Sequence, residues 1–317
     1  MEQRALGRSG VDVSRIILGC GNFGGIGSSP AFFGQGETEA EAHTLLDEAW
    51  EAGITTYDTA DAYGGGRSES YLGSWLRSRP DVRDRIVLTT KTFNRMHECA
   101  DSGLAPARMR RQLTSSLERL GVDSVHLYLT HEMDPQTPLA ETIAAFEEFV
   151  ADGFVRAYGG SNVDRPWLEE AVRHGSPSWV QNSFSLLDRA DETGVLPIVA
   201  QEGLGYTPFS PLAGGWLTGK YRRGEEAPAG SRMTLRPEPY LHLQEDRVYD
   251  ALEQFEVAAR ERETTPAALA IAWLLAHPRV TAVVIGPRRP EQLRPALEAL
   301  ELRLSPPEHE QIAGIFS

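Results

Sequence analysis

The chain has 317 residues, of which 41% are hydrophobic and 24% are charged, the proportions of a globular protein with a substantial core. Its formal net charge of −14 argues against a surface that binds nucleic acid or anionic membranes. Two cysteines, Cys20 and Cys99, are too few for a disulfide framework or a metal-ligand cluster, so we expect a reducing compartment and no bound metal. Neither a secretory signal nor an apolar run of membrane-spanning length is evident, and we therefore expect a cytoplasmic protein.

Short apolar strands alternate with amphipathic helices along the whole chain. The predicted strands lie at 15–18, 54–57, 86–89, 125–129, 154–158, 178–181, 205–209 and 281–285. The predicted helices begin near 38, 68, 106, 138, 166, 189, 247, 265, 290 and 306, with a long charged connection over 221–246. Such alternation implies parallel strands, and eight strand–helix units that close on themselves form a barrel. We therefore predict an α/β fold, a single-domain (β/α)8 TIM barrel over residues 1–317 with extra helices near the C-terminus; an open doubly wound sheet is the alternative.

A glycine-rich stretch after the first strand imitates a dinucleotide-binding turn. Gly19, Gly21 and Gly24 have the spacing G-x-G-x-x-G. In a genuine turn of this kind a helix must begin directly, because its N-terminus holds the pyrophosphate. Here the chain continues as GIGSSP, which is incompatible with a helix, so we predict a long loop over 19–36 instead.

Titratable side chains stand at the carboxyl ends of three successive predicted strands. Asp58 and Tyr63 follow the second strand, Lys91 ends the third and His131 ends the fourth. In a parallel barrel these ends form one rim, where catalytic groups are usually placed. Each side chain taken singly could be an ordinary packed or paired residue, but the four together could form one site.

These four side chains make a chemically coherent group. A tyrosine hydroxyl, with a pKa of about 10, is a weak acid at neutral pH, but an adjacent ammonium lowers its pKa. A buried lysine needs a carboxylate to stay charged. Asp58, Lys91 and Tyr63 would therefore form a proton-donating unit, and a neutral His131 could orient and polarise a carbonyl. In the absence of a Ser or Cys nucleophile or a metal cluster, this favours carbonyl reduction by hydride from an external cofactor.

Seven short motifs, placed on successive strands, resemble those of the aldo-keto reductase superfamily over nearly the whole chain. They are YDTADAYGGGRSE, TTK, LGVDSVHLYLTH, GGSN, QNSF, FSPLAGGWLTGKY and VIGPRRPEQL. By this resemblance Asp58, Tyr63, Lys91 and His131 correspond to the catalytic tetrad. Tyr63 would be the general acid in reduction and the general base in oxidation.

The resemblance also implies contacts with the nicotinamide half of a dinucleotide. Ser161, Asn162 and Gln181 match the residues that hold the nicotinamide carboxamide. Phe209 matches the aromatic residue that stacks on the nicotinamide ring. The loop beneath the pyrophosphate corresponds to Ser210, Leu212, Gly214, Leu217 and Lys220.

The adenosine half corresponds to the last strand and the helix that follows it. Gly286, Arg288 and Gln292 match the region that contacts adenine and the 2′-phosphate. An arginine beside a helix N-terminus suits a phosphate dianion, so we expect NADPH/NADP+, with NADH less favoured. An asparagine that commonly contacts adenine is replaced by Ala296, so the adenine contact should differ from the usual pattern.

Substrate contacts are the least defined, because they fall on loops. The candidates are Asn22, Phe23, Phe93 and Met133. The aromatic residues suggest an apolar or sugar-like aldehyde or ketone, such as a sugar or a secondary-metabolite carbonyl. We expect a small-molecule partner, and neither nucleic acid nor a membrane; the sequence does not indicate the oligomeric state.

Two other functions fit parts of the pattern. Some members of the superfamily serve mainly as partners of membrane channels, so a nicotinamide-binding regulatory subunit with weak or no turnover is the alternative. A (β/α)8 lyase or isomerase that uses Lys91 as a Schiff base is a third possibility, although the grouping of Lys91 with Asp58 and Tyr63 argues against it. His126, inside the fourth strand, is predicted to be a packing or rim residue.

Overall fold

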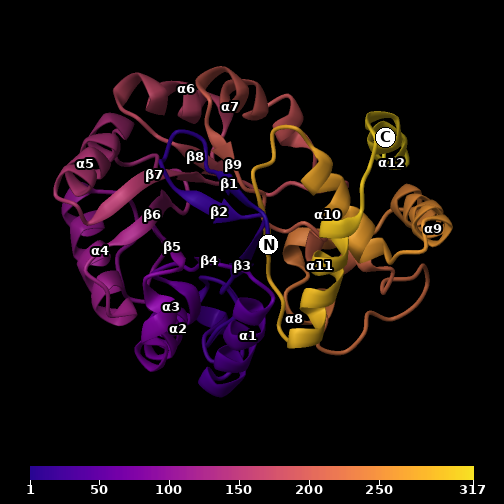
Figure 1. The fold of residues 1–317 in the computed structure, drawn as a ribbon, viewed down its shortest axis with the longest axis horizontal. Coiled ribbons are helices and arrows are strands. Elements are labelled where there is room, and N and C mark those ends of the chain that lie inside the picture. Colours follow the sequence, from indigo (N-terminus) through magenta and orange to yellow (C-terminus); the bar gives the residue numbers. More distant parts are fainter.

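The computed structural model describes residues 1–317 and contains one curled sheet of eight parallel strands (Figure 1). The prediction of eight parallel strands is therefore confirmed. In sheet order the strands are β10 (Val283–Ile285), β3 (Ile16–Gly19), β4 (Thr56–Asp58), β5 (Val87–Thr92), β6 (Val125–Thr130), β7 (Val155–Ser161), β8 (Trp179–Gln181) and β9 (Gly205–Tyr206).

The two outermost strands of the sheet approach each other without forming a full ladder. β9 has only two residues and is not paired with β10 as a strand. Two backbone hydrogen bonds nevertheless span the gap, from Thr281 N to Tyr206 O at 2.8 Å and from Val284 N to Pro208 O at 2.9 Å. The sheet is thus curled into a barrel-like form that is not completely closed.

Helices lie on the outside of the sheet and connect consecutive strands (Figure 1). This arrangement follows from apolar stripes such as Met109, Leu113 and Leu117 on one face of α4, which are buried while the opposite face is polar. The connecting helices are α1 (Glu39–Glu51), α2 (Arg67–Ser78), α3 (Pro80–Arg83), α4 (Pro106–Leu120), α5 (Leu139–Ala151), α6 (Arg165–His174), α7 (Leu196–Glu202), α8 (Arg232–Leu235), α9 (Asp246–Glu261) and α10 (Pro266–Ala276). After β10 come α11 (Arg294–Glu301) and α12 (Pro306–Gly314).

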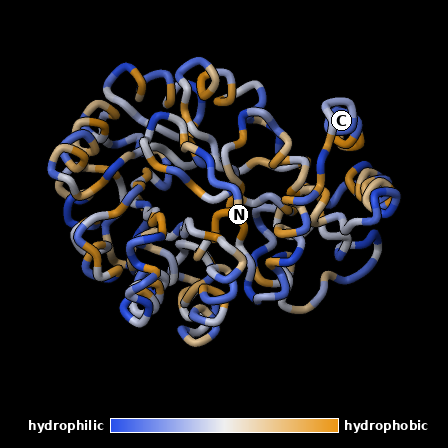
Figure 2. The backbone as a smooth tube through the Cα atoms, viewed as in Figure 1, coloured by the Kyte–Doolittle hydropathy of each residue, from blue (hydrophilic) through white to orange (hydrophobic).

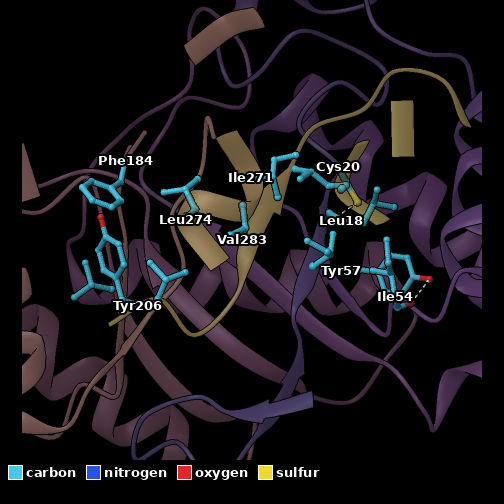
Figure 3. Packing of buried hydrophobic residues seen from close by; sticks show 14 of the residues in the cluster. Leu18, Cys20, Ile54, Tyr57, Phe184, Tyr206, Ile271, Leu274 and Val283 are labelled. Atoms are coloured by element: carbon cyan, nitrogen blue, oxygen red, sulfur yellow. Dashed lines mark hydrogen bonds between the residues drawn. The ribbon is translucent and has the colours of Figure 1, made fainter. Parts of the chain in front are cut away.

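The main hydrophobic core fills the space between the sheet and its helices. Figure 2 shows hydrophobic and hydrophilic residues alternating along the helices. Figure 3 shows part of this core, in which Leu18, Val283 and Ile271 are almost completely buried. A second, smaller cluster lies inside the curl, where Ile17, Leu127 and other inward-facing strand residues pack together.

A short hairpin covers the amino-terminal ends of the strands, and the sequence had not indicated it. Its strands, β1 (Gln3–Ala5) and β2 (Asp12–Ser14), are antiparallel. Leu6, Val11 and Val13 from this hairpin belong to the inner cluster. The hairpin therefore covers the end of the curl opposite to the carboxyl ends of the strands.

Three segments contain more separate helical pieces than the sequence predicts. The segment 189–201 is a 3-10 turn, Ala190–Glu192, followed by α7, and 290–300 is a 3-10 turn, Pro290–Leu293, followed by α11. Pro295 explains the second division, because proline lacks the N–H that a continuous α-helix would need at that position. The connection 221–246 contains α8 and a 3-10 segment, Glu238–Leu243. No helix in the structure is both long and apolar enough to cross a membrane.

Candidate active site

The carboxyl ends of the strands surround a cavity of about 1230 Å³. Register brings these ends together, since β4 pairs with β5 and β5 with β6 in parallel. Asp58 is the last residue of β4, Lys91 lies near the end of β5 and His131 follows β6. Tyr63 opens a 3-10 turn in which Gly64, with a φ of 59°, takes a left-handed conformation that favours glycine. A Cβ atom on Gly64 would stand 2.5 Å from the carbonyl oxygen of Phe23, so the tight packing here also requires glycine.

The four side chains form a connected group at the base of the cavity. Lys91 Nζ donates to Asp58 Oδ2 at 2.5 Å and to Tyr63 Oη at 3.3 Å. Tyr63 Oη is 3.4 Å from His131 Nε2. Asp58, Tyr63 and His131 line the cavity, whereas Lys91 lies behind them and is 1% exposed. Lys91 and His131 therefore converge on the Tyr63 hydroxyl, and Asp58 is paired with Lys91.

Burial and charge set the protonation states in this group. Burial lowers the pKa of Lys91, but the charge of Asp58 and then Tyr63 outweigh it, so the Lys91 pKa is raised. Burial, with the Lys91 ammonium second, holds the pKa of His131 well below its usual range. The lysine is thus charged and the imidazole neutral at pH 7. A charged lysine paired with a carboxylate is a poor Schiff-base nucleophile, which counts against the lyase hypothesis.

The Tyr63 hydroxyl differs in one respect from the expectation. The Lys91 ammonium does pull the pKa of Tyr63 down, as predicted, but burial pushes it up more strongly, so the net pKa of Tyr63 is raised. The predicted net lowering is therefore wrong for this state of the protein. The physical reason is that burial of the hydroxyl disfavours the phenolate more than one ammonium at 3.3 Å favours it. Tyr63 is protonated at neutral pH and can donate.

The residues predicted to hold the nicotinamide lie beside this group. Gln181 Nε2 donates to Asp58 Oδ1 at 3.0 Å. The amide oxygen of Gln181 takes no part in this hydrogen bond. Asn162 has a φ of 54° and donates from Nδ2 to the backbone oxygen of His131 at 2.9 Å. Ser161 and Phe209 line the same cavity. The polar groups are thus brought together at one end of the cavity.

The cavity continues along the loop that follows β9. Ser210, Leu212, Gly214 and Lys220 line it, and Lys220 is exposed. Gly214 has a φ of 64°, and a Cβ atom there would stand 2.6 Å from the ring of Tyr240. A side chain at this position would therefore collide with the Tyr240 ring.

The segment after β10 also lines the cavity. Gly286, Arg288, Gln292 and Ala296 line it. The Gln292 side-chain oxygen accepts from the backbone N–H of Arg288 at 2.7 Å, which holds the two residues together. The guanidinium Nε of Arg288 donates to Glu37 at 2.6 Å.

Three predicted contacts do not line the cavity, and one previously unnoticed group does. Phe23 and Leu217 are completely buried in the main core, because their apolar side chains point away from the groove. Met133 is 39% exposed and lies outside the cavity lining, while the predicted Asn22 and Phe93 are part of it. The lining residues that were not predicted include Glu132, Arg232, Arg236 and Tyr240. Three of these come from the 221–246 connection, where only the local excess of arginine could have indicated a role.

The cavity fits a nicotinamide dinucleotide. The same cavity is lined by Tyr63 and His131, by Gly214 and Lys220 on the loop after β9, and by Arg288 after β10. Amide side chains, glycine backbone and cations thus line one cavity, and these groups suit the carboxamide and the phosphates of a dinucleotide.

Comparison with known proteins identifies the family. The sequence model of the Aldo/keto reductase family matches residues 15–316. The chain belongs to the aldo/keto reductase family. It is 36% identical to the uncharacterized oxidoreductase YrpG of Bacillus subtilis, over 96% of this chain and 92% of that protein. The NADH-specific methylglyoxal reductase of Escherichia coli is 33% identical, over 96% and 95%. A putative voltage-gated potassium channel subunit beta of Schizosaccharomyces pombe is 31% identical, over 94% and 88%.

Family membership confirms the resemblance found in the motifs. This aldo/keto reductase is an oxidoreductase of a family that uses nicotinamide cofactors and reduces small carbonyl compounds.

Proposed function

We propose that this aldo/keto reductase reduces an aldehyde or ketone to an alcohol, with Tyr63 as the proton donor and NADPH preferred over NADH. The observation that carries the proposal is the convergence on the Tyr63 hydroxyl, with Lys91 Nζ at 3.3 Å and His131 Nε2 at 3.4 Å. We also propose that residues 1–317 form one domain and that its sheet closes as a (β/α)8 barrel. The hydrogen bonds between the β9 and β10 segments support this closure.

The side chains divide the reaction among themselves. When bound, the dinucleotide supplies the hydride. Neutral His131 would hydrogen-bond to the substrate carbonyl and orient it, and Tyr63 would transfer its hydroxyl proton to the carbonyl oxygen as negative charge develops there. The Lys91 ammonium, kept charged by Asp58, would stabilise the phenolate left on Tyr63.

The same cavity offers contacts along the whole dinucleotide. Ser161, Asn162 and Gln181 would hold the nicotinamide carboxamide, with the Gln181 oxygen accepting because its amide nitrogen donates to Asp58. Phe209 would stack on the nicotinamide. The pyrophosphate would lie along Ser210, Leu212, Gly214 and Lys220, and adenosine beside Gly286, Arg288 and Gln292.

Arg288 supports the preference for NADPH, because a guanidinium suits a phosphate dianion. One relative is named as NADH-specific, so the preference has to be measured for this chain. On the substrate side, Phe93 and Glu132 line the cavity with His131, a mixture of aromatic and polar groups. We propose a sugar-like or secondary-metabolite carbonyl that offers both an apolar face and hydroxyl groups.

Titration by fluorescence with NADPH and NADH, followed by a panel of aldehydes, quinones and ketosugars, tests the activity. We expect saturable binding that favours NADPH and a loss of NADPH absorbance that depends on the carbonyl compound. Tyr63→Phe should lower kcat by about 10²–10⁴-fold while leaving the Kd for NADPH within about twofold, because the ring remains and only the proton is lost. A loss of NADPH binding as large as the loss of rate would contradict the assignment of Tyr63 as the acid.

A regulatory subunit is the second candidate, favoured by the relative named as a potassium channel subunit beta. Binding of NADPH with no turnover of any carbonyl compound would support it. The intact group around Tyr63 favours the reductase.

A further inference from the structure

A buried carboxylate stands behind the arginine at the adenosine end of the cavity. Glu37 is 5% exposed, and its Oε1 accepts from Arg288 Nε at 2.6 Å. Its Oε2 is buried and has no hydrogen-bond partner. The Glu37 backbone is fixed by hydrogen bonds to the loop after β3, from Glu37 N to Asn22 O at 2.9 Å and from Gly24 N to Glu37 O at 2.8 Å.

Glu37 is the only carboxylate paired with Arg288. The remaining contacts of the Arg288 guanidinium are weak, with NH1 3.5 Å from the backbone oxygen of Gly230. The Arg288 side chain is 36% exposed and lines the cavity, whereas Glu37 lies behind it and does not. A ligand in the cavity would therefore meet an arginine whose charge is already compensated from behind.

This arrangement matters for a phosphate dianion more than for a hydroxyl group. A phosphate beside Arg288 would gain the attraction of the guanidinium but would also be repelled by the buried carboxylate, where screening by water is weak. A ribose 2′-hydroxyl carries no charge and would be almost indifferent to Glu37. Glu37 should therefore change the difference between the binding free energies of NADPH and NADH.

We propose that Glu37 is a specificity-determining residue that weakens the selection of NADPH over NADH by neutralising Arg288. This inference rests on the proposed dinucleotide site. Burial raises the pKa of Glu37, while the hydrogen bond and charge of Arg288 oppose the rise, which agrees with a carboxylate that depends on this one cation. The nearby Glu41 adds repulsion to Glu37, and its own side chain is occupied by the N-cap Thr38.

Substitution by glutamine separates charge from position. In Glu37→Gln the side-chain oxygen can still accept from Arg288 Nε, so the guanidinium keeps its place while the negative charge is lost. Glu291→Gln is the matched control, because Glu291 is exposed, lines the same cavity and forms no ion pair with Arg288. The double variant Glu37→Gln with Arg288→Ala removes the cation through which Glu37 is proposed to act.

The experiment measures dissociation constants by calorimetry for NADPH, NADH, 2′,5′-ADP and ADP, with thermal unfolding as a check of folding. In Glu37→Gln we expect binding of NADPH and 2′,5′-ADP to tighten about tenfold, with NADH and ADP changed less than about twofold. Glu291→Gln should leave the ratios unchanged. In the Arg288→Ala background the Glu37 substitution should have no effect on them, because without the guanidinium burial favours the neutral, protonated form of Glu37.

Binding of NADPH that is unchanged relative to NADH in Glu37→Gln would overturn the inference. Weakened binding would overturn it too, and would indicate that the carboxylate serves to position Arg288. An equal change of the NADPH-to-NADH affinity ratio in Glu291→Gln would overturn the inference as well, since the change would then follow from the net charge of the protein and not from Glu37. Failure of the unmodified protein to bind either dinucleotide would instead refute the proposed function, and the inference with it.

Discussion

The buried pair of Lys91 and Asp58 should carry a large share of the stability of the site. Their side chains are 1% and 4% exposed, and Nζ lies 2.5 Å from Oδ2. In Lys91→Met, Asp58 would remain as a buried carboxylate whose other side-chain contact is the Gln181 amide. Breaking one partner of such a pair costs about 3–5 kcal/mol, chiefly because an unpaired charge stays buried. We expect this decrease in the free energy of unfolding at pH 7.

Removing the unpaired negative charge of Asp58 as well should restore much of the lost free energy of unfolding. In the double variant Lys91→Met with Asp58→Asn, the asparagine oxygen can still accept from Gln181, and we expect a net loss of only about 1–2 kcal/mol relative to the unmodified protein. The assay is urea denaturation followed by tryptophan fluorescence and circular dichroism. Lys91 and Lys220 are the only lysines in the chain, so Lys220→Met, which removes an exposed charge, is the matched control and should change stability by less than about 0.5 kcal/mol. A double variant as unstable as Lys91→Met alone would refute the account, since the loss would then not arise from an unpaired Asp58.

Three further predictions concern protonation and charge. Because the Tyr63 pKa is raised, carbonyl reduction should persist through neutral pH and decline only above about pH 10, whereas alcohol oxidation should increase with pH; an ionisation of Tyr63 near neutrality in a pH–rate profile would contradict this. Lys220 is exposed and Lys91 buried, so an amine-reactive reagent should label Lys220 and not Lys91, and saturating NADPH should protect Lys220; undiminished labelling of Lys220 measured by mass spectrometry would place the pyrophosphate elsewhere. Burial, followed by the charge of Glu69, raises the pKa of Asp61 to about 7, so the favourable contribution of its protonated form is complete below about pH 4 and is lost as the pH rises through 7. Asp61→Asn should therefore gain roughly 1–3 kcal/mol of stability relative to the unmodified protein between pH 5 and pH 8, as measured by denaturation at each pH, and a constant difference would exclude this titration.

The sequence by itself determined the parallel strands and the group around Tyr63. Strand and helix periodicities are local, and parallel pairing places every carboxyl end on the same rim, so Asp58, Lys91 and His131 could be brought together without knowledge of their contacts. The motifs then indicated the family, which the comparisons confirm.

Only the tertiary structure decided the balance of burial and charge at Tyr63 and the contacts between residues distant in the sequence. The pKa of Tyr63 depends on how completely the hydroxyl is buried, which no local pattern encodes. Phe23 and Leu217 occur in motif-like segments, yet their side chains turn into the core. The pairing of Glu37 with Arg288 joins residues 251 positions apart. Such contacts arise only when β10 pairs with β3 and so brings the segment after β10 beside the loop after β3, and for that reason the sequence revealed the arginine and not its partner.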